Sequence, residues 1–157
     1  MAQCTLRAVA GSDLDAIFEQ MRDPASLRTA AFTANDPDDR SAFDAPMAKV
    51  TSSPEVRYRV IVRDSRLVGT IACDVSEGVS DVTFWIDRPH WGRGTATRAL
   101  GLLLEEISVR PIRARTASNN AGSLRVRQKA VFLPIGTEVS FALGRSGEIE
   151  ETTLELS

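Results

Sequence analysis

The sequence is poor in cysteine, lysine, histidine and tyrosine, and it contains no long apolar run. Among its 157 residues, Cys4 and Cys73 are the two cysteines, and they lie far apart. A disulfide framework is therefore not expected, and the reducing cytoplasm is the predicted compartment. No apolar run approaches the ~18 residues of a membrane helix. The first residues do not combine a basic segment with an apolar one, so we also expect no signal peptide.

The charge balance is close to neutral, with a formal net charge of −2 at pH 7. Such a balance gives no reason to expect binding to nucleic acid or to a membrane surface. Hydrophobic residues make up 43% of the chain and charged residues 25%, which is ordinary for a globular protein. We find no internal repeat and no low-complexity tract, and we expect a single domain over residues 1–157.

The hydrophobic pattern alternates between strand and helix periods along the chain. Residues 25–35 carry only a weak pattern, inside a segment (23–54) that we expect to vary and to shape a binding site. The order of elements predicts an α/β (α+β) fold, a mixed, largely antiparallel sheet of about seven strands with helices on both faces. We expect strands at 5–9, 56–63, 67–75, 81–86, 112–117, 137–143 and 149–156. We expect helices at 14–21, 36–50, 96–109 and 121–130.

The stretch Trp91-Gly92-Arg93-Gly94-Thr95-Ala96 lies between a predicted strand and a predicted helix. A glycine-punctuated loop in this context directs several backbone N–H groups to one point. The helix adds the positive end of its dipole at the same point. The sequence therefore predicts an anion site here, and a diphosphate fits it well.

Two blocks of sequence together resemble the GCN5-related N-acetyltransferase (GNAT) superfamily. The family's signature, Gln/Arg-x-x-Gly-x-Gly/Ala, is similar to Trp91–Ala96, with Trp91 in the place of Gln or Arg. The second block has Asn120 and Ser123 three residues apart, followed by Lys129 and Phe132. These features, with Phe84-Trp85-Ile86 before the loop, look like the branch of ribosomal-protein alanine acetyltransferases.

The resemblance implies acetyl-CoA as cosubstrate and no metal. Backbone N–H groups of Trp91, Gly92, Arg93, Gly94, Thr95 and Ala96 would bind its diphosphate. Strand residues Phe84, Trp85 and Ile86 would hydrogen-bond the pantetheine arm through the backbone. Trp85 or Phe84 would line the substrate channel, although both also read as plain core residues. Arg98 and Lys129 are the alternatives for contacting the 3′-phosphate. Residues 107–137 form a basic run without acidic residues, which includes Arg127 and Lys129 and otherwise reads as a solvated face.

The resemblance also implies roles for individual side chains in catalysis. Asn120 and Ser123 would lie near the thioester sulfur, with Ser123 donating to the leaving thiolate, and Asn120 equally reads as a helix N-cap. Asp81 is the first candidate for general base, because relatives often have Glu there. A turn-capping aspartate is its alternative. His90, the single histidine, reads as a surface loop residue away from the thioester.

Three positions depart from the family pattern. Val131 stands where relatives have Gly before Phe132, and a positive φ there would strain a β-branched residue. Gln128 stands where relatives have Glu. The single tyrosine, Tyr58, lies in the predicted hairpin, so the second block offers no tyrosine acid.

The sequence thus predicts an acetyl-CoA-dependent N-acetyltransferase. It would transfer acetyl to a primary amine, of a peptide N-terminus or of a small molecule, by direct attack in a ternary complex. No cysteine lies in either block, which disfavours an acetyl-cysteine intermediate. The rival hypothesis is a non-catalytic acetyl-CoA-binding module on the same fold. A nucleotide-binding domain is disfavoured because Gly-x-x-x-x-Gly-Lys-Ser/Thr is missing. A monomer and a homodimer both remain open.

Overall fold

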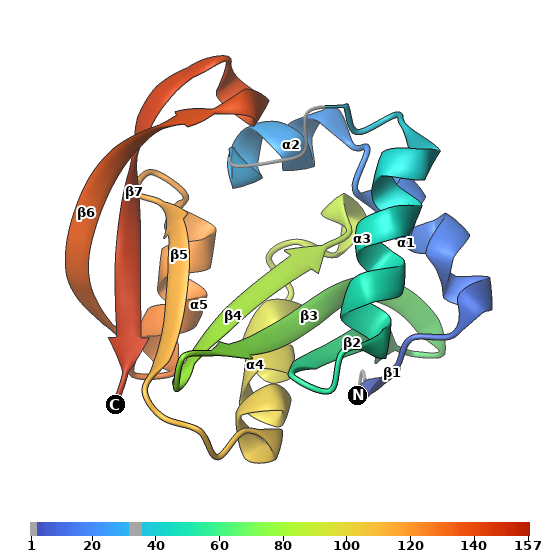
Figure 1. Cartoon of the computed structure of the whole chain (residues 1–157), viewed down its shortest axis with the longest axis horizontal. Helices are drawn as coiled ribbons and strands as arrows, with labels where there is room; N and C mark the ends of the chain where they lie inside the picture. Colours follow the sequence, from blue (N-terminus) through green and yellow to red (C-terminus); the bar gives the residue numbers. More distant parts are fainter. Residues whose placement is uncertain (1–2, 32–35) are drawn as a thin grey trace.

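A seven-stranded sheet forms the centre of the protein, in the order β1-β2-β3-β4-β5-β7-β6 (Figure 1). This computed structural model describes residues 3–31 and 36–157. Every neighbouring pair of strands is antiparallel except β4 and β5, which run parallel. The strands are β1 (Cys4–Ala8), β2 (Val56–Arg63), β3 (Arg66–Ser76), β4 (Val79–Ile86), β5 (Ile112–Ala117), β6 (Leu133–Ala142) and β7 (Gly147–Leu156).

Helices cover both faces of the sheet. They are α1 (Leu14–Gln20), α2 (Pro24–Ala30), α3 (Arg40–Ser52), α4 (Thr95–Glu106) and α5 (Ala121–Lys129). On β2, Ile61 joins the buried cluster that contains residues of α4, whereas Val60 packs with Ile17 of α1 and Met47 of α3. Because adjacent residues of a strand point to opposite faces, α4 lies on one face, and α1 and α3 on the other. The predicted fold class is confirmed.

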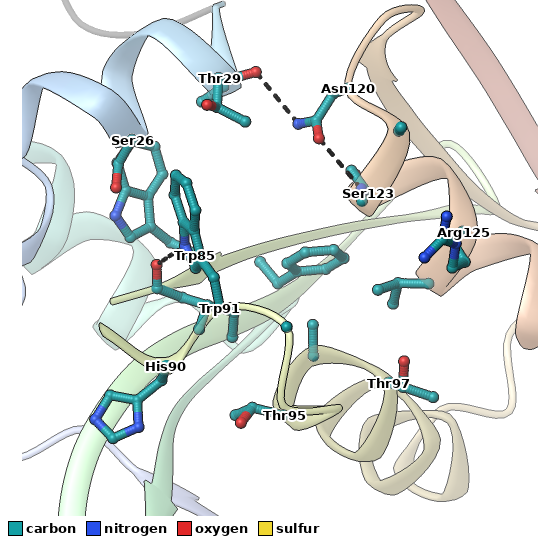
Figure 2. A pocket seen from close by; sticks show the side chains of 18 of the residues that line it. Ser26, Thr29, Trp85, His90, Trp91, Thr95, Thr97, Asn120, Ser123 and Arg125 are labelled. Carbon is teal, nitrogen blue, oxygen red and sulfur yellow. Dashed lines mark hydrogen bonds between the residues drawn. The ribbon is translucent and has the colours of Figure 1, made fainter. Parts of the chain in front are cut away.

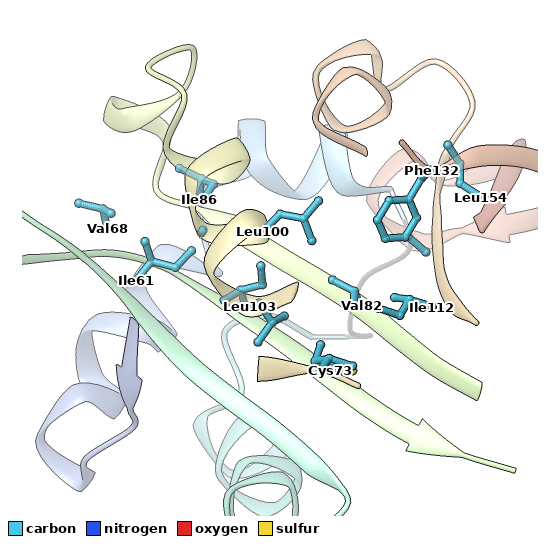
Figure 3. Close-up of a cluster of buried hydrophobic side chains, with 14 residues drawn as sticks. Ile61, Val68, Cys73, Val82, Ile86, Leu100, Leu103, Ile112, Phe132 and Leu154 are labelled. Carbon is cyan, nitrogen blue, oxygen red and sulfur yellow. The ribbon is translucent and has the colours of Figure 1, made fainter. Parts of the chain in front are cut away.

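The larger core fills the space between the sheet and α4 (Figure 3). Leu100 and Leu103 on α4 pack against Val82 of β4 and Ile112 of β5, and all four are almost fully buried. The apolar spacing of α4 follows the helical period, so one stripe of the helix faces the sheet. This packing fixes the N-terminus of α4 relative to β4. In the described ranges, no helix is long and apolar enough to cross a membrane.

The parallel strands β4 and β5 are joined over a short distance only. Their register contains two pairs, Ser80 with Ile112 and Asp81 with Arg113. Beyond Asp81, β4 continues to Ile86 with β3 as its partner, and no register with β5 is kept. The two strands therefore separate toward the end of β4, which leaves backbone groups facing the gap.

Most predicted elements are confirmed, with differences at four points. Helix α3 begins at Arg40, capped by Asp39, instead of at residue 36, and α4 ends at Glu106 instead of residue 109. Helix α2 lies in the weakly patterned segment and was not predicted, although Asp23 caps it by accepting from Ser26 N and Pro24 starts it. Strand β6 begins at Leu133 instead of residue 137. It is an edge strand with a bulge after Pro134, and an edge tolerates the missing N–H of proline. Residues 1–2 and 32–35, part of the predicted N-terminus and of the weak segment, lie outside the described residues.

Val131 ends α5 in a left-handed backbone conformation. Its φ is +71°, its N–H donates to Gln128 O at 3.0 Å, and the N–H of Phe132 donates to Arg127 O at 3.0 Å. These two bonds form a Schellman motif, whose left-handed position usually holds glycine. The strain expected from the sequence is therefore present. The Val131 side chain is 68% exposed and contributes little packing in return.

We predict that Val131→Gly stabilises the protein by about 1 kcal/mol, because glycine adopts positive φ without the clash of a β-branched side chain. Chemical denaturation monitored by circular dichroism measures the change. Val139→Gly is the matched control, since Val139 is 64% exposed on β6 with ordinary strand backbone. This control should lose stability. A destabilised Val131→Gly variant would contradict the strain argument.

Candidate functional site

A cavity of about 560 Å³ opens where β4 and β5 separate. Its walls come from the end of β4, the glycine loop and first turn of α4, the first turns of α5, and α2 (Figure 2). Its volume lies in the range of small-molecule and cofactor sites. The lining includes Ser26, Thr29, Ala30, Phe84, Trp85, Ile86, His90, Trp91, Gly92, Gly94, Thr95, Ala96, Thr97, Asn120, Ser123, Arg125, Val126, Lys129 and Arg145.

The glycine loop presents an uncapped helix N-terminus to this cavity. Gly92 and Gly94 have φ of +72° and +76°, which only glycine adopts without strain. Gly94 is the N-cap of α4, and among the described residues no side chain accepts from the first-turn N–H groups. These groups and the helix dipole are available to an anion. Arg63 of β2 holds the loop by donating to Thr95 Oγ1 at 2.7 Å and to Arg93 O at 3.2 Å, a role that the sequence did not reveal.

Two tryptophans shape the β4 side of the cavity. The indole of Trp91 donates to Ile86 O at 2.8 Å, which ties the loop back onto the last residue of β4. The indole of Trp85 donates to Gln20 O at the end of α1, at 3.2 Å. Phe84 both lines the cavity and packs against the larger core, so the two readings of this residue from the sequence coexist.

Asn120 joins two elements that line the cavity. Its Oδ1 accepts from Ser123 N at 3.2 Å, which is the predicted N-cap of α5. Its Nδ2 donates to Thr29 O of α2 at 3.2 Å, as the dashed lines in Figure 2 show. Arg145 adds a second tie between the same regions, donating to Arg28 O at 2.8 Å and to Asn119 Oδ1 at 2.6 Å. Helix α2 is thus fastened across the cavity by polar contacts.

The structure brings most of the predicted site residues to this cavity. Asp81 and Arg93 do not line it. Asp81 lies four residues before Trp85 on β4, at the parallel pair with β5, and its role as general base stays a prediction. His90 lines the cavity on the side of the glycine loop and is half-buried.

The basic residues near the cavity come from α5. The exposed Arg125 and Lys129 lie one helical turn apart and both line the cavity, whereas Arg98 does not. The lining residues Ser26, Thr29 and Ala30 were not predicted individually, although they lie in the segment expected to shape a binding site. The helix that carries them has no clear helical period of apolar residues. Asp23 followed by Pro24 is the signal that marks its start.

The comparison with protein families decides the family. The model described as "Acetyltransferase (GNAT) domain" matches residues 3–132, most of the chain. The chain belongs to the GNAT acetyltransferases. The predicted enzyme class, an N-acetyltransferase, is confirmed at the level of this family. A search of curated proteins gave no significant match.

Solved GNAT structures share the fold at low sequence identity. Mycobacterium smegmatis RimJ, solved with CoA-disulfide, is 20% identical with a TM-score of 0.81, covering 98% of this chain and 81% of that one. A ribosomal-protein-alanine N-acetyltransferase from Brucella melitensis is 17% identical with a TM-score of 0.82, covering 97% and 98%. Spermidine N-acetyltransferase from Vibrio cholerae, solved with CoA and spermine, is 20% identical with a TM-score of 0.78, covering 98% and 95%.

We predict that Asn120→Ala destabilises the GNAT domain by about 1–2 kcal/mol, through loss of the α5 cap, and also frees α2. Asn120→Ser is the matched variant, because its hydroxyl still caps α5 but is too short to reach Thr29 O. Urea denaturation reports the cap, and limited proteolysis after Arg28 reports the attachment of α2. Asn120→Ser should keep most of the stability yet show faster cleavage. Equal cleavage of wild type and both variants would contradict the tie.

Proposed function

We propose that this protein is an acetyl-CoA-dependent N-acetyltransferase that transfers acetyl to a primary amine by direct attack in a ternary complex. The observation that carries the proposal is one cavity that joins three features. These are the uncapped N-terminus of α4, the end of β4 that no longer pairs with β5, and the Ser123 hydroxyl at the start of α5.

The polar groups of the cavity fit the parts of acetyl-CoA in order. Backbone N–H groups of Trp91, Gly92, Gly94, Thr95 and Ala96 suit the diphosphate, whereas Arg93 does not line the cavity and its part in binding stays a prediction. The free edge of β4 suits the amides of the pantetheine arm, as an added strand would. Arg125 and Lys129 suit the 3′-phosphate at the open end. The CoA-bound structures of RimJ and of spermidine acetyltransferase support acetyl-CoA as the ligand.

The proposed reaction consists of a proton loss, a bond formation and a bond cleavage. The amine nitrogen must lose a proton and form a bond to the carbonyl carbon. The C–S bond then breaks, and its electron pair stays on sulfur. Ser123 lines the cavity, and in this proposal it donates a hydrogen bond to that sulfur. Asp81 lies on the same face of β4 as Trp85, roughly 13 Å along the strand, so as general base it would act through water.

The acceptor that we propose is a primary amine, either a peptide N-terminus or a small polyamine-like molecule. The named functions of the Brucella and Vibrio relatives support these two classes. The separation of β4 and β5 leaves room for the amine on the side of Trp85 and α2, opposite the core. We propose the cytoplasm, where acetyl-CoA and such amines occur together, as the compartment.

The non-catalytic acetyl-CoA-binding module is the second candidate. It is favoured by the strained Val131, by Gln128 in the place of Glu, and by the position of Tyr58, which does not line the cavity. The two functions differ in turnover and not in binding.

The test is calorimetry with acetyl-CoA, followed by measurement of thiol release with alanine-terminated peptides, spermidine and aminoglycosides. We expect saturable binding and thiol release with at least one amine. Binding without release from any amine would favour the non-catalytic module. No binding would overturn both candidates.

We predict that Ser123→Ala lowers kcat between about 10-fold and about 100-fold, the effect of one hydrogen bond to a developing charge. The KM for acetyl-CoA should change little, because the diphosphate and pantetheine contacts remain. Steady-state kinetics separate the two constants. Thr97→Ala, on the cavity wall at α4, is the control for loss of a hydroxyl, and its kcat should stay within about threefold. An unchanged kcat in Ser123→Ala would remove Ser123 from the mechanism.

A further inference from the structure

Arg127 is a buried arginine that the family pattern does not explain. It lies on α5 with 3% of its surface exposed, although five other residues of this short helix are exposed. Its guanidinium carbon lies 4.4 Å from the centroid of the Phe84 ring, in a cation–π contact. Burial without a carboxylate is costly for a charge, so a residue kept in this state calls for a reason.

Arg127 donates hydrogen bonds to Ser123, which lines the cavity. Its Nη1 donates to Ser123 Oγ, and also to Ser123 O at 3.4 Å. Its Nε is buried and has no partner among the described residues. Burial lowers the pKa of Arg127 to about 10, so the side chain stays cationic at neutral pH. The positive charge of Arg127 is therefore joined to the Ser123 hydroxyl by one hydrogen bond.

The donor and acceptor chemistry fixes the direction of the Ser123 hydroxyl. A guanidinium only donates, so Ser123 Oγ must accept from Arg127. The hydroxyl proton is then left to donate elsewhere. Within the described residues, Ser123 Oγ donates to no group, and Ser123 lines the cavity. The free O–H is thus available to a group inside the cavity, and Arg127 contacts both Ser123 and Phe84.

We propose that Arg127 is a positioning residue that holds and polarises Ser123 so that its O–H donates to the sulfur released from acetyl-CoA. This inference rests on the proposed function. The amine nitrogen forms a bond to the carbonyl carbon, the thioester C–S bond breaks, and its electron pair stays on sulfur. The proton that the amine loses passes through water to Asp81, the proposed general base. Arg127 itself touches neither substrate. It acts through one oxygen atom, and its charge favours the negative charge that develops there.

A double-mutant cycle between Ser123 and Arg127 tests this inference. The variants are Ser123→Ala, Arg127→Met and the double variant, assayed by thiol release with the amine that the wild type acetylates fastest. We expect Arg127→Met to lower kcat about tenfold, the size of one hydrogen bond, with the KM for acetyl-CoA within about twofold. In the Ser123→Ala background, Arg127→Met should change kcat less than about twofold, because the oxygen through which it acts is gone.

Two further variants keep the test decisive if Arg127→Met folds poorly. Arg127→Lys retains the charge and a donor, and it should recover part of kcat relative to Arg127→Gln, which keeps a donor without the charge. Arg115→Met, at an exposed position on β5 away from the cavity, controls for loss of an arginine and should keep the wild-type kcat. Circular dichroism establishes the fold of each variant.

The outcomes separate the two hypotheses. A wild type that binds acetyl-CoA but releases no thiol overturns the proposed function and the role of Arg127 with it. A wild type that turns over, with equal losses from Arg127→Met in both backgrounds, overturns the role of Arg127 alone. A kcat of Arg127→Lys no higher than that of Arg127→Gln would also contradict it.

Discussion

The short pairing between β4 and β5 is the constraint on which the rest of the structure depends. Two residue pairs hold these parallel strands together, and the sheet then divides. Every backbone N–H and C=O in a protein interior needs a partner. The division therefore leaves unmet hydrogen-bonding capacity along β4, in a cavity that also receives the uncapped N-terminus of α4. A ligand with amides along its length and phosphates at one end would satisfy both the free edge of β4 and the N-terminus of α4.

Apolar packing holds the side of the cavity that the glycine loop and α4 form. The glycine loop and α4 rest on the larger apolar core, which packs Leu100 and Leu103 against the sheet. The cation of Arg127 lies at the border of this core, over Phe84. Apolar packing supplies rigidity where the phosphates are expected, and it also supplies the low dielectric in which a buried charge acts strongly on its neighbour. The same apolar packing therefore serves both the stability of the fold and the electrostatics of the cavity.

The sequence was informative where a local pattern and the tertiary structure agree. Alternating residues predicted the strands, and the glycines predicted the loop, because positive φ is a local requirement that few residues meet. Helix α2 escaped prediction since it is short and its attachment depends on Asn120 and Arg145, which are about 90 to 117 residues away. Arg127 was read as part of a solvated basic run. Its burial depends on Phe84 and on the packing of α5, which no local pattern encodes.

The hydrogen bonds that attach α2 have a consequence for substitutions in this wall of the cavity. The wall that α2 forms is attached by side-chain and main-chain hydrogen bonds to the regions around Asn120 and Arg145. The small buried cluster at the end of α2 consists of alanines (Ala31, Ala117, Ala142), with Ile149 packed against them. Substitutions on the cavity side of α2 therefore leave the main core undisturbed. A change in this wall would alter the lining of the cavity, while the glycine loop and α4 keep their support from the larger core.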